Sequence, residues 1–332
     1  MTTVKDGLFQ YGGSAVGSGM LPVMGQTGTS GASKSFFVHG ALGNDGNPGT
    51  VKAPFKTVSA AYALCTAGAG DTVYVLNDGS STASVREAAG LTWAKKNTHL
   101  VGLCAPSINQ RARITPITTV TDDVDAFTPF LTVSADGCII KNISLVQGQT
   151  EDAKASVGIH VTGLRNYFEN VSVITAIHAN QCDEAGTSWV RVDGEENVFQ
   201  SCYIGQDTIA RSAANANVQF GSGSAEEATR NVFRDCIFPA YADNAGVLFI
   251  NAANATDTQR WNMFERCTFV NTGTSTMTEG VQYDGNGVLL LKDCGFYGCT
   301  DVVAADNTST QLVGPAGSPN VDVGMFKGVD IA

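Results

Sequence analysis

Charged residues are scarce in this chain of 332 residues, where Asp, Glu, Lys and Arg together make up 15%. Lysine and arginine number 20 against 31 aspartates and glutamates, so the formal net charge is -11. Neutralising nucleic-acid phosphates requires clustered lysine and arginine side chains, and here they are few and scattered. We therefore predict no nucleic-acid partner. An acidic surface suits solubility or a basic partner.

Long apolar runs are also lacking. No stretch approaches the roughly eighteen apolar residues that a membrane-spanning helix requires. The first residues show neither the basic segment nor the apolar segment of a secretory signal. The sequence thus predicts no membrane partner and synthesis in the cytoplasm.

The usual cysteine motifs are missing as well. Nine cysteines are an odd number for a disulfide framework, and no two of them are spaced as CxxC. The patterns of a zinc ribbon and of a thioredoxin-type redox site are therefore absent.

What the sequence does contain is an eight-residue pattern that recurs about every thirty residues. Its copies are CIIKNISL at 138–145, NYFENVSV at 166–173, NVFQSCYI at 197–204, NVFRDCIF at 231–238, NMFERCTF at 262–269 and LLLKDCGF at 289–296. Measured at the sixth position, the steps are 28, 31, 34, 31 and 27 residues. A variable step around a constant pattern is typical of a solenoid whose coils are joined by loops of adjustable length.

The third, sixth and eighth positions of the pattern are apolar or cysteine in every copy. Stacked about 4.8 Å apart, such positions form interior columns of like side chains. The cysteines of the sixth position are therefore predicted to be buried and reduced: Cys202, Cys236, Cys267 and Cys294. The fourth position is polar and should face solvent. The fifth lies at a sharp bend, where Asn and Asp tolerate the left-handed conformation, and Arg266 departs from that rule.

A second strand precedes most copies of the pattern, for example at 157–161, 189–192 and 218–220. Alternation along these strands predicts an outward column across neighbouring coils. Its expected members are His160, Arg191, Gln219, Phe249 and Gln282.

Together these features predict an all-β fold, a single-stranded right-handed parallel β-helix over residues 34–314. Between Pro54 and Ala67 the apolar residues fall at helical spacing, and Pro54 suits a first helical position. We expect a short α-helix over 54–67 to cap the open end of the coil. That end would otherwise expose core side chains and unpaired backbone.

The opening of this region resembles that of a known family. The segments are SFFV at 35–38, GNDGNPGT at 43–50, APFKTV at 53–58 and GDTVYV at 70–75. They are similar to the opening of the pectate-lyase-like β-helix superfamily, and the resemblance covers residues 34 to about 314. It implies that architecture but little about activity, since the superfamily includes lyases, hydrolases, adhesins and phage spikes.

Enzymes of that superfamily place catalytic Asp, His, Lys or Arg on neighbouring rungs of one face, but the signature motifs of its pectate lyases and polygalacturonases are missing here. His160 and Arg191 are expected to be stacked neighbours. Acidic residues occur nearby in the sequence at Asp152, Asp183, Glu184 and Asp193. Paired carboxylates can cleave a glycosidic bond, but acids in loops are usually solvated. We predict no catalytic site and no enzyme, with glycoside hydrolase or polysaccharide lyase activity as the alternative.

Two short clusters resemble metal sites only in part. His178 with Cys182, Asp183 and Glu184 lacks the second ligand pair of a zinc site. The segment NDGN at 44–47 lacks the alternating acids and terminal Glu of a calcium loop, so we predict a turn. No metal site and no cofactor are predicted.

Both ends of the chain fall outside the repeat. Residues 1–33 and 315–332 contain many glycines or prolines with interspersed aromatic residues and methionines. This composition favours extended arms that become ordered against a partner. The predicted partner-binding residues are Phe9, Tyr11, Leu21, Pro22, Met24, Met325 and Phe326.

An arm of this kind ahead of a β-helix resembles virion proteins of tailed bacteriophages. The resemblance implies a structural protein of the virion, made in the host cytoplasm. We expect a capsid decoration or cement protein whose arms bind the major capsid protein, another virion protein or neighbouring subunits. Spike proteins of this fold commonly trimerise, so a homotrimer is expected. The alternative is a tailspike-like protein that binds or degrades a polysaccharide, with the glycan on its lateral face.

Overall fold

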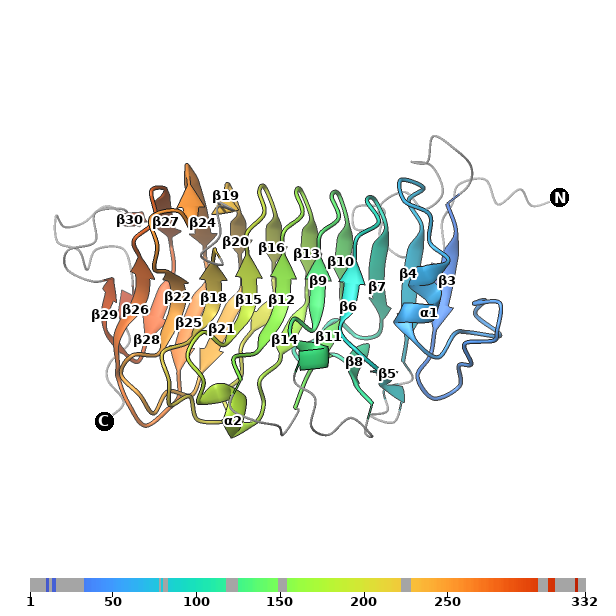
Figure 1. Ribbon diagram of the computed structural model, residues 1–332, viewed down its shortest axis with the longest axis horizontal. Helices are drawn as coiled ribbons and strands as arrows, with labels where there is room; N and C mark the ends of the chain where they lie inside the picture. Colours follow the sequence, from blue (N-terminus) through green and yellow to red (C-terminus); the bar gives the residue numbers. More distant parts are fainter. Residues whose placement is uncertain are drawn as a thin grey trace.

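The computed structural model of the chain describes residues 33–77, 79, 83–117, 125–148, 154–221 and 228–303, and the strand backbone at 10–11, 14–15, 310–313 and 326–327. Within these residues the chain winds into a parallel β-helix whose coils stack along one axis (Figure 1). Each complete coil adds one strand to each of three long sheets. The predicted all-β parallel β-helix is confirmed.

The three sheets are numbered here in the order in which a coil enters them. Sheet 1 runs β3 (Ser35–Val38), β4 (Thr72–Leu76), β7 (His99–Leu103), β10 (Ile139–Lys141), β13 (Tyr167–Glu169), β16 (Val198–Gln200), β20 (Val232–Arg234), β24 (Trp261–Glu265), β27 (Val288–Lys292) and β30 (Thr310–Val313). Sheet 2 runs β5 (Val85–Glu87), β8 (Arg113–Pro116), β11 (Ser144–Val146), β14 (Ser172–Ile174), β17 (Tyr203–Ile204), β21 (Ile237–Ala240), β25 (Thr268–Asn271), β28 (Gly295–Tyr297) and β31 (Phe326–Lys327). Sheet 3 runs β6 (Leu91–Trp93), β9 (Leu131–Val133), β12 (Val157–Val161), β15 (Ser188–Val192), β18 (Ala216–Phe220), β22 (Leu248–Ala252), β26 (Met277–Tyr283) and β29 (Cys299–Val303).

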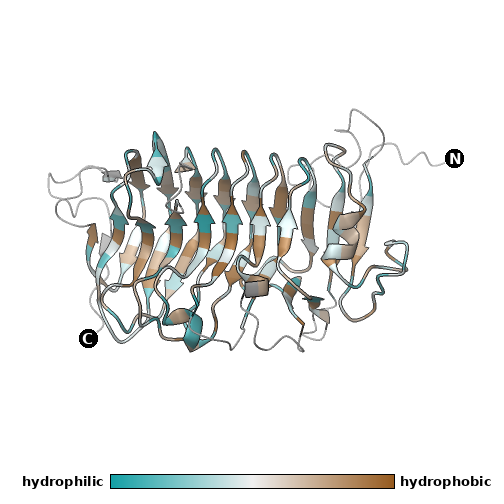
Figure 2. Ribbon diagram, in the orientation of Figure 1, coloured by the Kyte–Doolittle hydropathy of each residue, from teal (hydrophilic) through white to brown (hydrophobic). Residues whose placement is uncertain are grey.

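The remaining elements are short. They are the antiparallel pair β1 (Gln10–Tyr11) and β2 (Ser14–Ala15), the parallel pair β19 (Ala228–Thr229) and β23 (Thr258–Gln259), the 3-10 helix η2 (Asp125–Phe127), and the helices α1 (Val58–Ala63) and α2 (Ala179–Cys182). Apolar and polar bands alternate along the strands and repeat from coil to coil (Figure 2). The apolar bands are the inward positions of the repeat.

The interior columns predicted from the repeat are confirmed. At the third position, phenylalanine rings from successive rungs stack nearly parallel, with centroids 4.4, 4.4 and 4.5 Å apart. These rings belong to Phe168, Phe199, Phe233 and Phe264. Their spacing follows the separation of parallel strands, which leaves room for one aromatic ring per rung.

The cysteines of the sixth position are buried free thiols, as predicted. Each donates its S–H to a carbonyl of the preceding rung, as Cys267 does to Phe233 O at 3.5 Å. Burial raises the pKa of the Cys236 and Cys267 thiols, which keeps them protonated and unreactive. This column therefore behaves as a column of small apolar side chains.

The predicted left-handed bend is present at the fifth position of every copy. The φ angles are 53° at Asn142, 49° at Asn170, 53° at Ser201, 53° at Asp235, 52° at Arg266 and 53° at Asp293. Arg266 takes this conformation although it is not Asn, Asp or Gly, and its guanidinium pairs on the outer face, with Nε 2.8 Å from Asp235 and NH1 2.9 Å from Glu265. Ser201 has the same conformation, so the bend does not require Asn or Asp.

The polar fourth position faces outward, as predicted, and its side chains pair along the coil axis. Lys141 lies 2.8 Å from Glu169, and Glu265 lies 2.7 Å from Arg234 and 2.8 Å from Lys292. Hydrogen bonds from Lys292 and then Arg234 lower the pKa of Glu265 to about 2. Alternating charges therefore link neighbouring rungs on the outer face of sheet 1.

A ladder of buried asparagine side chains lies at the turn that leads into sheet 1. In each step the Oδ1 of one asparagine accepts the backbone N–H of the asparagine one rung earlier, at 2.9 to 3.0 Å. The ladder consists of Asn166, Asn197, Asn231 and Asn262. The Nδ2 of Asn231 also donates to Gly194 O at 2.9 Å. Each side chain thus satisfies turn backbone that no strand pairing reaches.

We expect Asn231→Ala to lower the free energy of unfolding by about 2 to 4 kcal/mol, since it leaves the Asn197 N–H and the Gly194 carbonyl buried without partners. Chemical denaturation monitored by circular dichroism measures the change. Asn286→Ala, at an exposed position, is the control and should stay within about 0.5 kcal/mol of wild type. Equal effects at the two positions would contradict this role for the ladder.

The first coil carries helix α1 where later coils carry strands of sheets 2 and 3. Val58 and Ala61 of the helix are buried in the same core as β3 and β4. Glu87 accepts the Val58 N–H at 2.7 Å, and the Thr57 side chain accepts the Ala60 N–H at 3.2 Å. Tyr62 stacks on Trp93 with centroids 4.0 Å apart. The helix therefore closes this end of the coil over the core.

The helix is shorter than the predicted range of 54–67. Thr57 is its N-cap, and Pro54 is not its first residue. Residues before Thr57 pair instead with the edge of β3: Phe55 N–H donates to Phe37 O, and His39 N–H donates to Phe55 O, both at 2.8 Å. These residues are extended rather than helical because their pairing gives hydrogen-bond partners to the backbone N–H and C=O groups on the edge of β3.

His99 on β7 is buried, and burial lowers its pKa from 6.5 to about 4. Its Nδ1 accepts the Ile139 N–H at 3.1 Å, which requires the neutral ring. The unfolded chain therefore binds this proton first as pH falls. The neutral, buried His99 ring therefore contributes its full stabilisation above pH 6.5. This stabilisation declines as pH falls from 6.5 to 4, and the total loss is roughly 3 kcal/mol.

We expect His99→Asn, whose Oδ1 can replace the Nδ1 acceptor, to remove this loss of stability between pH 6.5 and pH 4. Denaturation midpoints measured across that range test it. His178→Asn, which keeps a cap at the start of α2, controls for removing a histidine as such. An unchanged pH dependence in His99→Asn would contradict the assignment.

Candidate functional site

The outer face of sheet 3 carries an uninterrupted column of polar side chains along the coil axis. Strand register places Thr132 beside His160, His160 beside Arg191, Arg191 beside Gln219, Gln219 beside Asn251 and Asn251 beside Gln282. The predicted membership of Phe249 was wrong, because Asn251 holds that place and Phe249 is fully buried. The other predicted members lie in the column, which is polar throughout because Asn251 takes the place given to Phe249.

His160 of this column contacts the carboxylate of Asp193, which follows β15. His160 Nε2 lies 2.6 Å from Asp193 Oδ2, with the Asp193 side chain only 1% exposed and the imidazole 21% exposed. The second carboxylate oxygen of Asp193 is buried without a hydrogen-bond partner among the described residues. A buried carboxylate fixes the orientation of the imidazole, and such a histidine can exchange a proton with a ligand at the surface.

Arg191, on the next rung, adds a cation to this pair. Burial lowers its pKa, and the carboxylates of Asp193 and Asp257 oppose that effect. Its Nε is buried without a partner in the described part of the chain. Asp257 packs so closely on Gly221 (φ +74°) that a Cβ there would lie 2.3 Å from its Oδ1. Histidine, arginine and carboxylate groups thus occupy two adjacent rungs with hydrogen-bonding capacity to spare.

The other predicted acids do not join this group. Asp183 follows α2 and accepts a hydrogen bond from the Ser212 hydroxyl, and Glu184 lies in the same turn. Asp193 follows β15 and pairs with His160. Asp152 lies outside the described residues. The carboxylates that are neighbours in sequence therefore serve separate contacts.

The histidine and cysteine of the cluster at 178–184 have structural roles. His178 is the N-cap of α2, and its Nδ1 accepts the Asn180 N–H at 3.3 Å. Cys182 is buried and donates to Ala176 O at 2.9 Å. The turn predicted at 44–47 is present, and Asp45 there accepts the Lys56 and Thr57 N–H groups. The described residues contain no group of three or more His, Cys, Asp or Glu arranged to hold a metal.

Arg211 is a buried residue that no motif or pattern in the sequence indicates. It is completely buried, stacks on Trp189 at 4.6 Å, and donates to the Oδ1 atoms of Asn215 and Asn217 at 2.6 and 2.8 Å. It also donates to the Leu248 carbonyl at 3.1 Å. Burial lowers its pKa to about 9. The guanidinium therefore links the loop after β17 to strands β18 and β22 of sheet 3.

The predicted partner-binding residues of the arms lie almost entirely outside the described residues. Phe9, Leu21, Pro22, Met24 and Met325 are not described. Tyr11 lies in β1, where its backbone pairs with Ser14. Phe326 lies in β31, where its backbone pairs with Gly295 of β28. Their proposed contacts with a partner therefore stay predictions.

Among the described residues, no helix combines the length and apolar character needed to cross a membrane.

Comparison with known proteins finds solved structures of similar fold. No protein-family model and no curated protein matches the sequence. A rhamnogalacturonan lyase superposes with a TM-score of 0.53 at 13% identity, over 81% of this chain and 69% of that one. ORF18 of Geobacillus virus E2 gives 0.50 at 15% identity, over 75% of this chain and 46% of that one. A pectin methylesterase in complex with a hexasaccharide gives 0.49 at 16% identity, over 90% and 94%.

The chain is a parallel β-helix protein. Its fold is similar to that of the rhamnogalacturonan lyase. The chain spans less than half the length of the Geobacillus virus protein. At these identities the likeness extends to the fold alone.

Proposed function

We propose that this chain is a structural component of a tailed-bacteriophage particle, specifically a capsid decoration or cement protein. In this proposal the β-helix is a stiff body, and the two terminal arms attach it to the major capsid protein, another virion protein or neighbouring subunits. The particle is its place of action. The shared fold with a Geobacillus virus protein agrees with this role.

The observation that carries the proposal is how the polar groups of the body are used. Asp71 accepts the Lys34 and Thr66 N–H groups, both at 2.7 Å, which ties the start of the coil to the segment after α1. Glu87 caps α1, and His99 holds β10. Buried polar side chains that are hydrogen-bonded in this way stiffen a fold. A stiff body with apolar, glycine-rich ends suits attachment to a particle.

We expect the full chain to co-purify with phage particles, and a variant lacking residues 1–33 to be lost from them because its attachment segment is gone. Particles purified on a density gradient and analysed by mass spectrometry measure incorporation. The control is His160→Ala, which changes the polar column on sheet 3 and leaves both arms intact, and it should be incorporated like wild type. Circular dichroism checks that the truncated chain retains its β-helix. Full incorporation of the folded, truncated chain would refute the arm's role.

A second candidate function is binding or degradation of a polysaccharide on the lateral face. The observation that favours it is the His160–Asp193 pair at 2.6 Å beside Arg191. An imidazole held by a buried carboxylate can accept a proton from a sugar, and an arginine one rung away can bind an anionic sugar group. The polar column continues along the coil beyond this pair and Arg191.

If this second function holds, the wild-type protein should bind or cleave at least one polysaccharide of the host surface. Asp193→Asn should lower turnover by about 100-fold or more, because it removes the charge that orients the imidazole. Gln282→Ala, at the far end of the same column, is the matched control and should retain most of the activity. Product release from a panel of neutral and acidic glycans is the measurement. Equal activity in Asp193→Asn and wild type would exclude this site.

A further inference from the structure

Over its first coils, the outer face of sheet 1 is buried. Figure 1 shows β3, β4 and β7 at the N-terminal end of this sheet. Val73 of β4 and Leu100 of β7 lie in the core, so the residues on either side of them face outward. Two of these outward residues, Tyr74 and Val101, are nevertheless only 3% and 4% exposed. We call this surface the first-coil patch, and it consists of Phe37, Tyr74, His99 and Val101.

Neighbours within the sheet do not account for this burial. Phe37 stacks on Tyr74 with centroids 5.3 Å apart, and Val101 pairs on the other side of the ring. Such neighbours flank a side chain along the sheet but leave its outer side open to water. Tyr167, which has an apolar side chain on each side of it in the same sheet, is partly exposed. A further segment of chain therefore lies over the first-coil patch.

The ionisable groups of the patch are desolvated. Burial raises the pKa of Tyr74 to about 12 and lowers the pKa of His99 to about 4. A hydrated loop resting on the patch would leave both side chains partly in water. The segment over the patch thus excludes water, as apolar side chains do.

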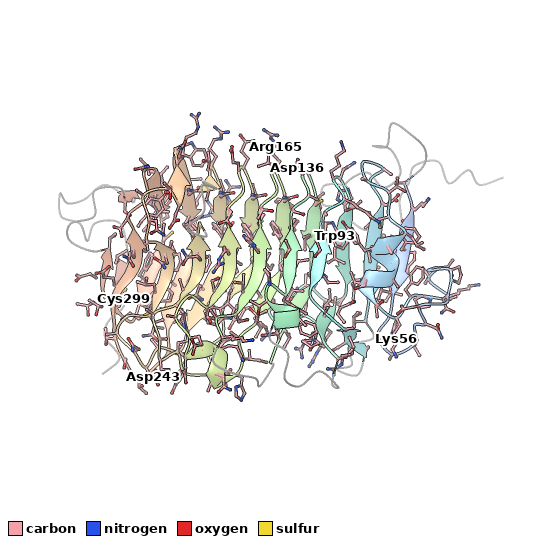
Figure 3. The ribbon with its side chains drawn as sticks, in the orientation of Figure 1. Lys56, Trp93, Asp136, Arg165, Asp243 and Cys299 are labelled. Carbon is pink, nitrogen blue, oxygen red and sulfur yellow. The ribbon has the colours of Figure 1, made fainter. Side chains whose placement is uncertain are left out.

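The patch ends where the outer face of sheet 1 becomes charged. On the next two rungs, the column of Tyr74 and Val101 continues as Lys141 and Glu169, an ion pair at 2.8 Å. Figure 3 shows Asp136 and Arg165 at the outer edge of the turns before these rungs, away from the core. An apolar segment therefore fits the N-terminal end of the sheet, where the chain enters the coil.

We propose that residues 20–32 of the same chain fold back over the first-coil patch, and that the apolar segment at 20–24 is the part that covers it. Residues 20–32 directly precede the coil, whose first described residue is Ser33. Strand β3 begins two residues later and carries Phe37 of the patch. The patch thus lies beside the point where this segment joins the coil.

The length and the chemistry of the segment both suit this place. Residues 20–24 read MLPVM and contain no charge, and methionine adapts well to irregular apolar surfaces. Residues 25–32 read GQTGTSGA, a composition typical of a linker without large apolar side chains. Eight extended residues span up to about 26 Å, whereas β3 and β7 are two rungs, or about 10 Å, apart. The linker is therefore long enough to bring 20–24 onto the patch.

This assignment changes the role of one part of the arm. Leu21, Pro22 and Met24, which were predicted to bind a partner, here bind the coil of their own chain. Phe9 and Tyr11 then remain for a partner on a particle. The proposal does not depend on the proposed function, since it concerns the isolated chain.

Nitration of tyrosines tests the cover in the full-length protein. Leu21→Asp places a charge in the covering segment, and Phe9→Asp places the same charge elsewhere in the arm as the matched control. Tetranitromethane is the probe, and peptide mass spectrometry gives the rate at each tyrosine. Tyr297, which is 39% exposed, and the buried Tyr283 are internal references. Circular dichroism checks that each variant retains the β-helix.

In wild type and in Phe9→Asp, we expect Tyr74 to react about tenfold more slowly than Tyr297, or slower still. In Leu21→Asp, and in a variant that lacks residues 1–32, nitration of Tyr74 should rise by roughly tenfold while Tyr283 stays protected. A Tyr74 that reacts like Tyr297 in wild type would overturn the proposal. So would a Tyr74 that stays protected in the shortened, folded chain, or equal effects of Leu21→Asp and Phe9→Asp.

A cross-linking experiment decides whose segment covers the patch. A photoreactive phenylalanine analogue replaces Leu21, and the illuminated protein is separated on a denaturing gel. We expect cross-linked product at the mass of one chain, with mass spectrometry locating the link on β4 or β7. Cross-linked product at the mass of two chains would show that a second copy supplies the segment, and links to other strands would show that it lies elsewhere. Either result would overturn the proposal.

Discussion

The structure depends on one constraint, which is that each coil must lie directly over the previous one in fixed register. Parallel strands hold successive rungs about 4.8 Å apart, so equivalent residues of successive copies meet face to face. The phenylalanine column fills this spacing with rings 4.4 to 4.5 Å apart. The asparagine ladder maintains it at the turn, where strand pairing ends and each amide joins two rungs. Loops can then vary in length without disturbing the core.

The same register extends to the exterior and turns single residues into surfaces. On sheet 3 it aligns polar side chains and brings His160 onto Asp193 beside Arg191. On sheet 1 it aligns six partly exposed apolar side chains at the second position of the repeat, those of Ile139, Tyr167, Val198, Val232, Met263 and Leu290. Both surfaces are consequences of stacking, and neither is evident from one rung alone. The two faces of one solenoid thus differ in chemistry, one polar along the column and one apolar at the second position of the repeat.

The core and the Asn- and Asp-containing bends could be predicted because they depend only on residue type and period. Arg266 could not, since it is not Asn, Asp or Gly, and the Asp235 carboxylate that its Nε contacts lies one rung away. Arg165, Glu196 and Arg230 are also left-handed, at the turns beside the buried asparagines, and their residue types do not indicate it. Phe249 was misplaced because alternation shows which residues of a strand share a face but not which of them pairs with a given residue of the neighbouring strand. Loops of different length between the strands keep that register from being read from the sequence.

By itself, the sequence determined the architecture, the inward columns, the buried thiols and the outward, polar fourth position of the repeat. These follow from a repeating pattern of side-chain size and polarity, which the chain carries regardless of its loops. Only the tertiary structure decided which outward residues become neighbours, how far α1 extends, and that Asp193 rather than Asp183 meets His160. Those outcomes depend on contacts between residues about thirty positions apart, whose alignment is set by stacking and by loops that the repeat does not encode.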